Sequence, residues 1–210
     1  MLVALRLHWT CYRYLGLIVS TCHNGTSPKH IYDWGMHSFF NRHVSSDMTV
    51  LDIGCGEGSL TKKIAQRVYK VTAYDINRRS IETARKKNSA DNIEYFFGDA
   101  LEALPQGKYD AVILSSILTF VDEKDVFLAK LHDVTNTLLI RETRYDNDYI
   151  VLLSKEFGIR KSPYYEYTKE EIVNKLRETG WEITDSWDTY DIFLKAESRD
   201  PAQTLGNNIR

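Results

Sequence analysis

The sequence has few cysteines, almost no excess charge and no long apolar run. Its 210 residues include only Cys11, Cys22 and Cys55, which is too few for a disulfide framework and typical of a reducing compartment. The 27 basic and 29 acidic residues nearly cancel, so the chain lacks the positive charge that nucleic acid attracts. We therefore expect a cytoplasmic protein that binds a small molecule and no nucleic acid.

No uninterrupted apolar stretch approaches the roughly 18 residues needed to span a bilayer. Segment 1–22 is the most apolar, but Arg6, His8 and Arg13 interrupt it and disfavour a secretory signal. Because its apolar residues recur at helical spacing, we interpret it as an amphipathic helix packed on the domain. A membrane-surface helix is the alternative. After a turn-rich break, residues 31–44 show a second helical pattern.

The rest of the chain alternates short apolar segments with helical patterns. The expected strands are 49–53, 70–75, 93–97, 109–114, 137–141, 181–187 and 190–195. The expected helices are 59–67, 77–88, 122–131, 148–157 and 169–179, with Asp122 and Thr168 as N-caps. This alternation predicts a doubly wound α/β fold with a mostly parallel, seven-stranded sheet. The last two strands have no helix between them, so we expect an antiparallel edge there.

These patterns divide the chain into three parts. We expect an N-terminal helical cap over 1–45, a catalytic domain over 46–197 and a flexible tail over 198–210.

A glycine-rich turn follows the first expected strand directly. Gly54, Gly56 and Gly58 let the backbone turn tightly and approach a ligand closely. Ligands of open α/β sheets bind at the carboxyl ends of the strands. Asp75 ends the next strand, where an acidic residue can accept hydrogen bonds from both ribose hydroxyls. Together these residues predict a cofactor that contains a nucleoside.

The turn is neither a P-loop nor a regular dinucleotide motif. A dinucleotide site reads G-x-G-x-x-G, whereas here Gly58 comes one place early and Ser59 follows it. The carboxylate of Asp52, just before the turn, would repel a pyrophosphate but suits a cationic cofactor with an amino group. Cys55 has no visible catalytic partner, and a small residue is all that the turn needs there. An NAD(P)-dependent oxidoreductase and a non-catalytic cofactor-binding protein stay open as alternatives.

Four segments in order resemble the class I S-adenosylmethionine-dependent methyltransferases. They read VLDIGCGEGSL, AYDI, YFFGDA and YDAVILSSIL, and the resemblance extends over about 46–196. Two further stretches, NGTSPKHIYDWGMHSFF and LIRETRYDNDYIVLLSKEFGIRKSPYYEYTKEE, are similar to a subgroup found beside polysaccharide and glycan biosynthesis enzymes. The resemblance implies a Rossmann-like methyltransferase fold and S-adenosylmethionine as the cofactor.

The resemblance also implies how the cofactor's methionine half is held. Gly54, Gly56 and Gly58 would pass under it, Asp52 would contact its amino end directly or through water, and Ser115 would lie near its carboxylate.

The adenosine half has its own implied partners. Asp75 would bind the ribose hydroxyls and Ile76 would pack on the adenine. Asp99 would accept a hydrogen bond from the adenine amino group, and the backbone N–H of Ala100 would donate to the ring.

Methyl transfer from a sulfonium is an in-line displacement that depends mainly on alignment. A hydroxyl acceptor gains from a general base, whereas an ionised acceptor needs none. Glu142, at the end of the fifth strand, and His30, in the segment expected to cover the cofactor, are the candidate bases. The alternatives are that Glu142 pairs with Arg141 or Arg144 at the surface and that His30 caps a helix.

The acceptor is predicted only as a class. Ser115-Ser116 stands where an Asn-Pro-Pro-Tyr motif would support amino-methylation, so we expect O-methylation of a small polar acceptor, with a sugar or glycan precursor as a candidate. The cap and residues 145–167 would select it, and Arg141 or Arg144 could bind an anionic group.

A metal site is not expected. The candidate ligands Cys22, His23, His30, His37 and His43 have gaps that do not match those of zinc sites.

Overall fold

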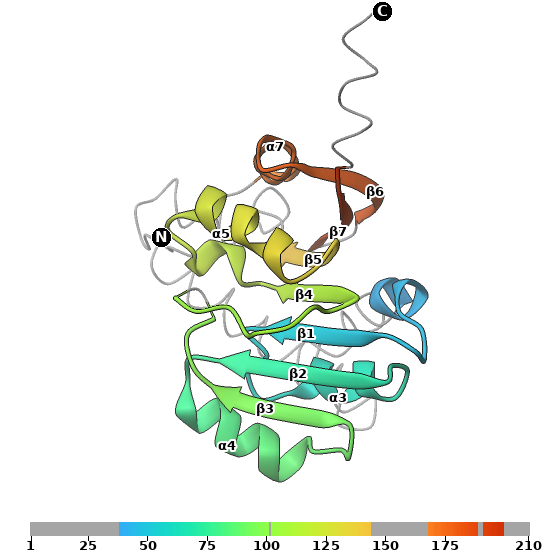
Figure 1. The fold of residues 1–210 in the computed structure, drawn as a ribbon, viewed down its shortest axis with the longest axis vertical. Helices are drawn as coiled ribbons and strands as arrows, with labels where there is room; N and C mark the ends of the chain where they lie inside the picture. The colour runs from blue at the N-terminus through green and yellow to red at the C-terminus, as the bar shows by residue number, and fades with distance from the viewer. Residues whose placement is uncertain (1–37, 101, 144–167, 189–190, 200–210) are drawn as a thin grey trace, which may run out of the picture. The chain divides into compact units, whose positions relative to one another are not determined.

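The computed structural model describes residues 38–100, 102–143, 168–188 and 191–199. The described residues from Phe39 onward form one compact unit. Its centre is a seven-stranded sheet with the order β3-β2-β1-β4-β5-β7-β6 (Figure 1). The expected helix 148–157 and the residues His30 and Arg144 lie outside the described residues.

The strands follow the expected pattern closely. They are β1 (Thr49–Ile53), β2 (Lys70–Asp75), β3 (Ile93–Phe97), β4 (Ala111–Ser115), β5 (Thr137–Thr143), β6 (Trp181–Asp188) and β7 (Asp191–Ser198). β1 to β5 pair in parallel, and β7 lies antiparallel between β5 and β6. The chain therefore leaves β1 toward one side of the sheet and β4 toward the other, which places the switch point between these two strands.

The helices begin and end for local reasons. They are α3 (Ser59–Ala65), α4 (Arg78–Lys87), α5 (Lys124–Lys130) and α7 (Lys169–Glu178), with the 3-10 turns η1 (Leu118–Phe120) and η2 (Leu131–Asp133). Asn77 caps α4 by accepting backbone N–H bonds from Arg79 and Ser80. The predicted capping box of α7 is confirmed: Thr168 accepts from the N–H of Glu171, whose carboxylate accepts from the N–H of Thr168.

The predicted start of the helix 122–131 at Asp122 is wrong. α5 begins at Lys124, and Glu123 is the N-cap without a side-chain hydrogen bond. The reason is that η1 uses the preceding residues for a 3-10 turn and Val121 is extended, so helical dihedral angles are reached later.

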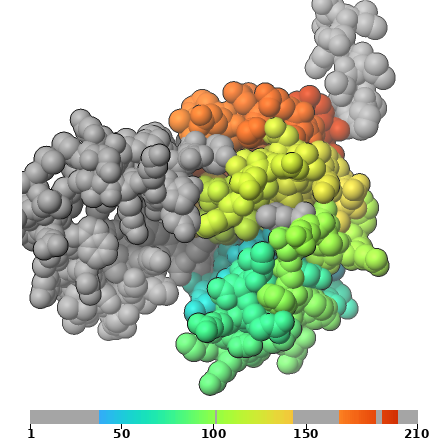
Figure 2. Space-filling model, turned by 90° about the vertical axis from the view of Figure 1, so that its left-hand side faces the viewer, coloured from blue at the N-terminus to red at the C-terminus, as the bar shows by residue number. Residues whose placement is uncertain are grey.

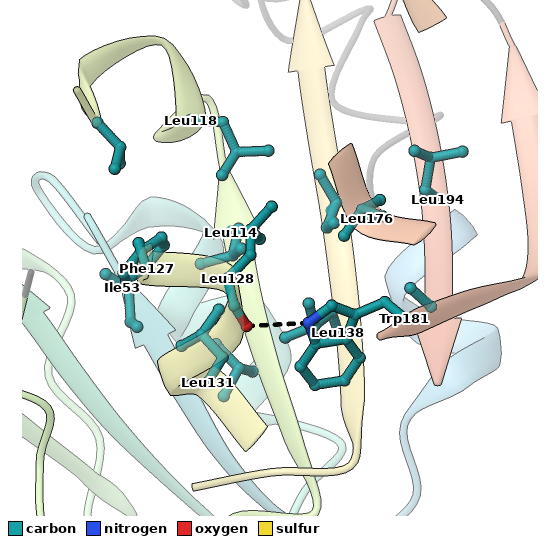
Figure 3. Close-up of a cluster of buried hydrophobic side chains, with 14 of the residues drawn as sticks. Ile53, Leu114, Leu118, Phe127, Leu128, Leu131, Leu138, Leu176, Trp181 and Leu194 are labelled. Atoms are coloured by element: carbon teal, nitrogen blue, oxygen red, sulfur yellow. Dashed lines mark hydrogen bonds between the residues drawn. The ribbon is translucent and has the colours of Figure 1, made fainter. Parts of the chain in front are cut away.

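The sheet is covered on both faces. Alternate strand residues such as Leu114, Leu138 and Leu194 pack under α5 and α7 (Figure 3), where the indole N–H of Trp181 donates to the carbonyl of Leu128 over 2.9 Å. Figure 2 shows α7 in orange packed against the yellow segment that contains α5. A smaller cluster of Ala73, Ile81, Ala84 and Tyr95 lies under α4. No helix of the described residues is long and apolar enough to cross a membrane.

Candidate functional site

The glycine turn leaves β1 at the switch point. Gly54, Gly56 and Gly58 have φ values of 75°, 55° and 80°, all in the left-handed region that favours glycine. The N–H groups of Gly54 and Cys55 both donate to the carbonyl of Tyr74, over 2.8 and 3.0 Å. The turn is thereby attached to the end of β2.

The three glycines are required for two different reasons. A Cβ on Gly54 would lie 2.8 Å from Cδ1 of Ile117, and a Cβ on Gly58 would collide with the hydroxyl of Tyr95. A Cβ on Gly56 would meet no atom of the described residues within 4 Å. Gly54 and Gly58 therefore make room for the protein's own side chains, whereas Gly56 leaves its backbone open to a ligand.

Asp75 joins the turn to the start of α4. Its Oδ2 accepts a hydrogen bond from the N–H of Gly56 over 2.8 Å, and its Oδ1 accepts from the N–H of Asn77 over 2.7 Å. A carboxylate has about four lone-pair sites, so both oxygens keep capacity for a diol. The neighbouring Ile76 is 67% exposed, so its apolar side chain is accessible to a flat ring.

Asp52 lies beneath the turn rather than beside it. The carboxylate is buried, and its Oδ2 accepts a hydrogen bond from the hydroxyl of Thr61 in α3 over 2.6 Å. Burial raises the pKa of Asp52 to about 6, the Thr61 bond opposes this, and the nearby charge of Asp75 adds to it. Sequence reasoning missed Thr61, which is buried in the first turn of α3.

The other predicted cofactor residues lie at the same edge of the sheet. Asp99 and Ala100 follow β3, and the N–H of Gly98 donates to the carbonyl of Asp75 over 3.2 Å. Asp99 is half-buried and Ala100 is buried. Ser115 ends β4 and is half-buried opposite Arg141 of β5. The fold thus brings the carboxyl ends of β1, β2, β3 and β4 to one place, as the sequence predicted.

Glu142 is buried near the end of β5. Its Oε1 accepts a hydrogen bond from the N–H of Leu118 over 2.9 Å, and its Oε2 is buried with no hydrogen-bond partner among the described residues. Burial raises the pKa of Glu142 to about 7, against the effects of the Leu118 N–H and the charge of Arg141. The interpretation of Glu142 as a surface partner of Arg141 is wrong.

Arg141 pairs instead with a residue that sequence reasoning missed. Its Nε and Nη2 donate to Oδ2 of Asp191 over 2.8 and 2.6 Å, and its Nη1 donates to Oγ of Ser116 over 2.5 Å. Successive residues of a strand point to opposite faces of the sheet, so the side chains of Arg141 and Glu142 have different partners. Asp191 could not be assigned from sequence, because its position depends on the insertion of β7 next to β5.

Neither a metal centre nor a cysteine nucleophile is formed by the described residues. They contain no group of three or more His, Cys, Asp or Glu side chains that could hold a metal ion. Burial and the charges of Asp52 and Asp75 raise the pKa of the Cys55 thiol, so it stays protonated and is a poor nucleophile.

Comparisons with known proteins match this geometry. Residues 50–137 match the family model described as a methyltransferase domain. The chain is 28% identical over 176 residues to the mitochondrial ubiquinone biosynthesis O-methyltransferase of Schizosaccharomyces pombe, which covers 73% of this chain and 62% of that protein. It is 29% identical over 177 residues to the ubiquinone biosynthesis O-methyltransferase of Rickettsia akari, covering 78% and 67%.

Solved structures show the same fold. Magnesium protoporphyrin IX methyltransferase from Synechocystis, crystallised with bound SAH, aligns with a TM-score of 0.66 at 22% identity. The alignment covers 81% of this chain and 83% of that one.

Proposed function

We propose that the chain is a class I S-adenosylmethionine-dependent methyltransferase that methylates an oxygen of a small polar acceptor. The matched family model, the sheet order and the two related O-methyltransferases support this proposal. When bound, the cofactor supplies an electrophilic methyl group on a cationic sulfur. The residues of this chain have to bind that donor, orient it and handle the proton of the acceptor.

The observation that carries the proposal is the hydrogen bond from the N–H of Gly56 to the carboxylate of Asp75. It lies beside the face of Gly56 that the described residues leave open. The carboxylate that is suited to the ribose also fixes the backbone of the glycine turn, so the two halves of a nucleoside donor would meet one preformed surface. Ile76 offers its exposed side chain to the adenine, and Asp99 and Ala100 follow on the neighbouring strand. These groups fit S-adenosylmethionine.

The methionine half would lie over Gly54, Gly56 and Gly58. Ser115 at the end of β4 would approach its carboxylate. Asp52 is buried against Thr61, so we propose that it acts on the amino end through water or through the backbone of the turn.

Glu142 is the proposed general base. Its Oε2 has no hydrogen-bond partner in the part of the chain that the structure describes, and a pKa of about 7 places its proton uptake near neutral pH. A hydroxyl of the acceptor that donates to Oε2 would satisfy this oxygen and lose its proton to it during transfer. His30 stays a second candidate and lies outside the described residues, as does the whole region 145–167 proposed to select the acceptor.

The proposed acceptor class is based on the two related ubiquinone biosynthesis O-methyltransferases. Their names support an O-methyltransferase, and a sugar or glycan hydroxyl is one proposed member of the acceptor class. The oxidoreductase alternative has no support from the matched family model or from these relatives.

Two assays test the proposal. Calorimetry should show binding of S-adenosylhomocysteine and none of NAD. Transfer of a labelled methyl group to hydroxyl compounds should then proceed with the natural chain and fall about 10²–10⁴-fold in Glu142→Gln, which keeps the acceptor for the Leu118 N–H but removes the base. Binding of NAD without S-adenosylhomocysteine would exclude the methyltransferase proposal. An unchanged rate in Glu142→Gln would exclude only the base.

A further inference from the structure

The segment that follows β4 is held from both faces of the sheet by two consecutive residues of β5. Arg141 and Glu142 point to opposite faces, yet both reach back to residues 116–118. Both bonds lie at the carboxyl edge, next to the glycine turn.

The bonds from Arg141 fix Ser116. The carbonyl of Arg141 accepts the N–H of Ser116 over 2.7 Å, and its guanidinium donates to Oγ of Ser116 over 2.5 Å. Asp191 takes two other N–H groups of the same guanidinium, which sets the orientation of its plane. Ser116 is therefore held by its backbone and by its side chain at once.

The backbone of Ser116 is itself unusual. With φ at 55°, it is the one non-glycine residue in the left-handed region among the described residues. Such a conformation persists where the surroundings over-determine it, and it is concentrated at functional sites. The four hydrogen bonds of Arg141, two to Ser116 and two to Asp191, are those surroundings.

The bond from Glu142 fixes the other end of the segment at the N–H of Leu118. Ile117 lies between the two fixed points. Its Cδ1 lies 2.8 Å from the position that a Cβ on Gly54 would take, so its side chain packs directly on the first glycine of the turn.

We propose that Ser116, Arg141 and Glu142 are positioning residues that hold the side chain of Ile117 as a wall beside the glycine turn, against which the methionine half of the donor binds. We call these three residues the β5 clamp. The inference rests on the proposed function, because it requires the turn to be the donor site. If the clamp loosens, Ile117 moves away from Gly54 and the methionine half loses its fitted surface. The adenosine half keeps its own binding surface, which is formed by Asp75 and Ile76.

Two ligands separate these halves. S-adenosylhomocysteine has both, whereas 5′-methylthioadenosine lacks the amino-acid part. Calorimetry on the full chain should show that Ser116→Ala and Ile117→Ala bind S-adenosylhomocysteine about fivefold more weakly, as expected for one lost hydrogen bond or contact. Both variants should bind 5′-methylthioadenosine like the natural chain. The control Ser45→Ala removes a serine hydroxyl in an exposed loop before β1 and should change neither affinity.

The outcomes distinguish the clamp from the donor site. If the natural chain binds S-adenosylhomocysteine and the two variants bind it equally well, the clamp is wrong and the proposed function stands. Equal weakening of both ligands also overturns the clamp, since the effect would not belong to the methionine half. If the natural chain binds neither ligand, the proposed function itself fails. Should a thermal melt show Ser116→Ala unfolded, Ile117→Val gives the same comparison with a smaller expected loss.

Discussion

The carboxylate of Asp75 accepts a hydrogen bond from the backbone N–H of Gly56 over 2.8 Å, so the end of β2 and the glycine turn after β1 form one unit. This bond lies where the donor's ribose and methionine half would meet. A change at Asp75 therefore acts on the shape of the turn and on the proposed ribose contact together.

Asp75→Ala is expected to weaken the binding of S-adenosylhomocysteine by roughly 1.5–3 kcal/mol, because hydrogen bonds that involve a charged group are lost. Calorimetry measures this directly. Asp91→Ala, which removes an exposed carboxylate in the turn before β3, is the matched control. Unchanged affinity in Asp75→Ala would mean that the ribose has been assigned to the wrong residue.

Gly56→Ala and Gly58→Ala should separate binding from folding. At Gly56 a Cβ meets open space, so the fold should lose only about 1–2 kcal/mol from the left-handed backbone while donor binding is lost. At Gly58 the Cβ also collides with Tyr95, so about 2–4 kcal/mol should be lost. Denaturant unfolding and calorimetry on both variants provide the comparison. A Gly56→Ala variant that binds the donor normally would contradict the open ligand side assigned to this glycine.

Glu142→Gln should change how stability depends on pH. In the folded state the pKa of Glu142 is raised from 4.5 to about 7. Its contribution to the free energy of unfolding is therefore fully present below about pH 4.5, the pKa in the unfolded chain, and is lost as the pH rises through about 7. The variant lacks this dependence. Its stability relative to the natural chain should therefore improve by a few kcal/mol between about pH 4 and pH 8. Parallel denaturant curves at the two pH values measure the difference, and a constant difference would contradict the burial of an ionisable group there.

Thr61→Val tests the carboxylate under the turn. The valine has nearly the shape of threonine but removes the hydroxyl that bonds Asp52. Since the natural pKa of Asp52 is about 6, the variant should lose about 1–3 kcal/mol near pH 8, where Asp52 is ionised, and less near pH 5, where it is mostly neutral. Thermal melts at both pH values are sufficient. An equal loss at both would show that the hydroxyl serves packing alone.

The sheet, and the edge of it that we propose to bind the methyl donor, could be predicted because they depend on local patterns. Alternating apolar segments and helices specify the crossovers, and the carboxyl ends of parallel strands meet whatever the side chains are. Asp75 and the glycines were therefore assigned to one place from spacing alone. The separate reasons for Gly54 and Gly58 could not be predicted, since they depend on Ile117 and Tyr95 from later parts of the chain.

The environment of β5 could be predicted only in part. The carboxyl end of β5 was expected at the edge proposed to bind the donor. Alternation along a strand implies that Arg141 and Glu142 point to opposite faces of the sheet. The partner of Arg141 is Asp191, fifty positions away, and it becomes a neighbour only because β7 enters the sheet beside β5. Tertiary packing of this kind leaves no local signal in the sequence.

The most direct test of the account is a crystal structure of the chain with S-adenosylhomocysteine. We expect the ligand to lie over Gly56, with its ribose hydroxyls on the carboxylate of Asp75 and its amino-acid end beside Ile117. A ligand bound elsewhere, or an Asp75 side chain turned away from the sugar, would contradict the assignment of this edge as the methyl-donor site.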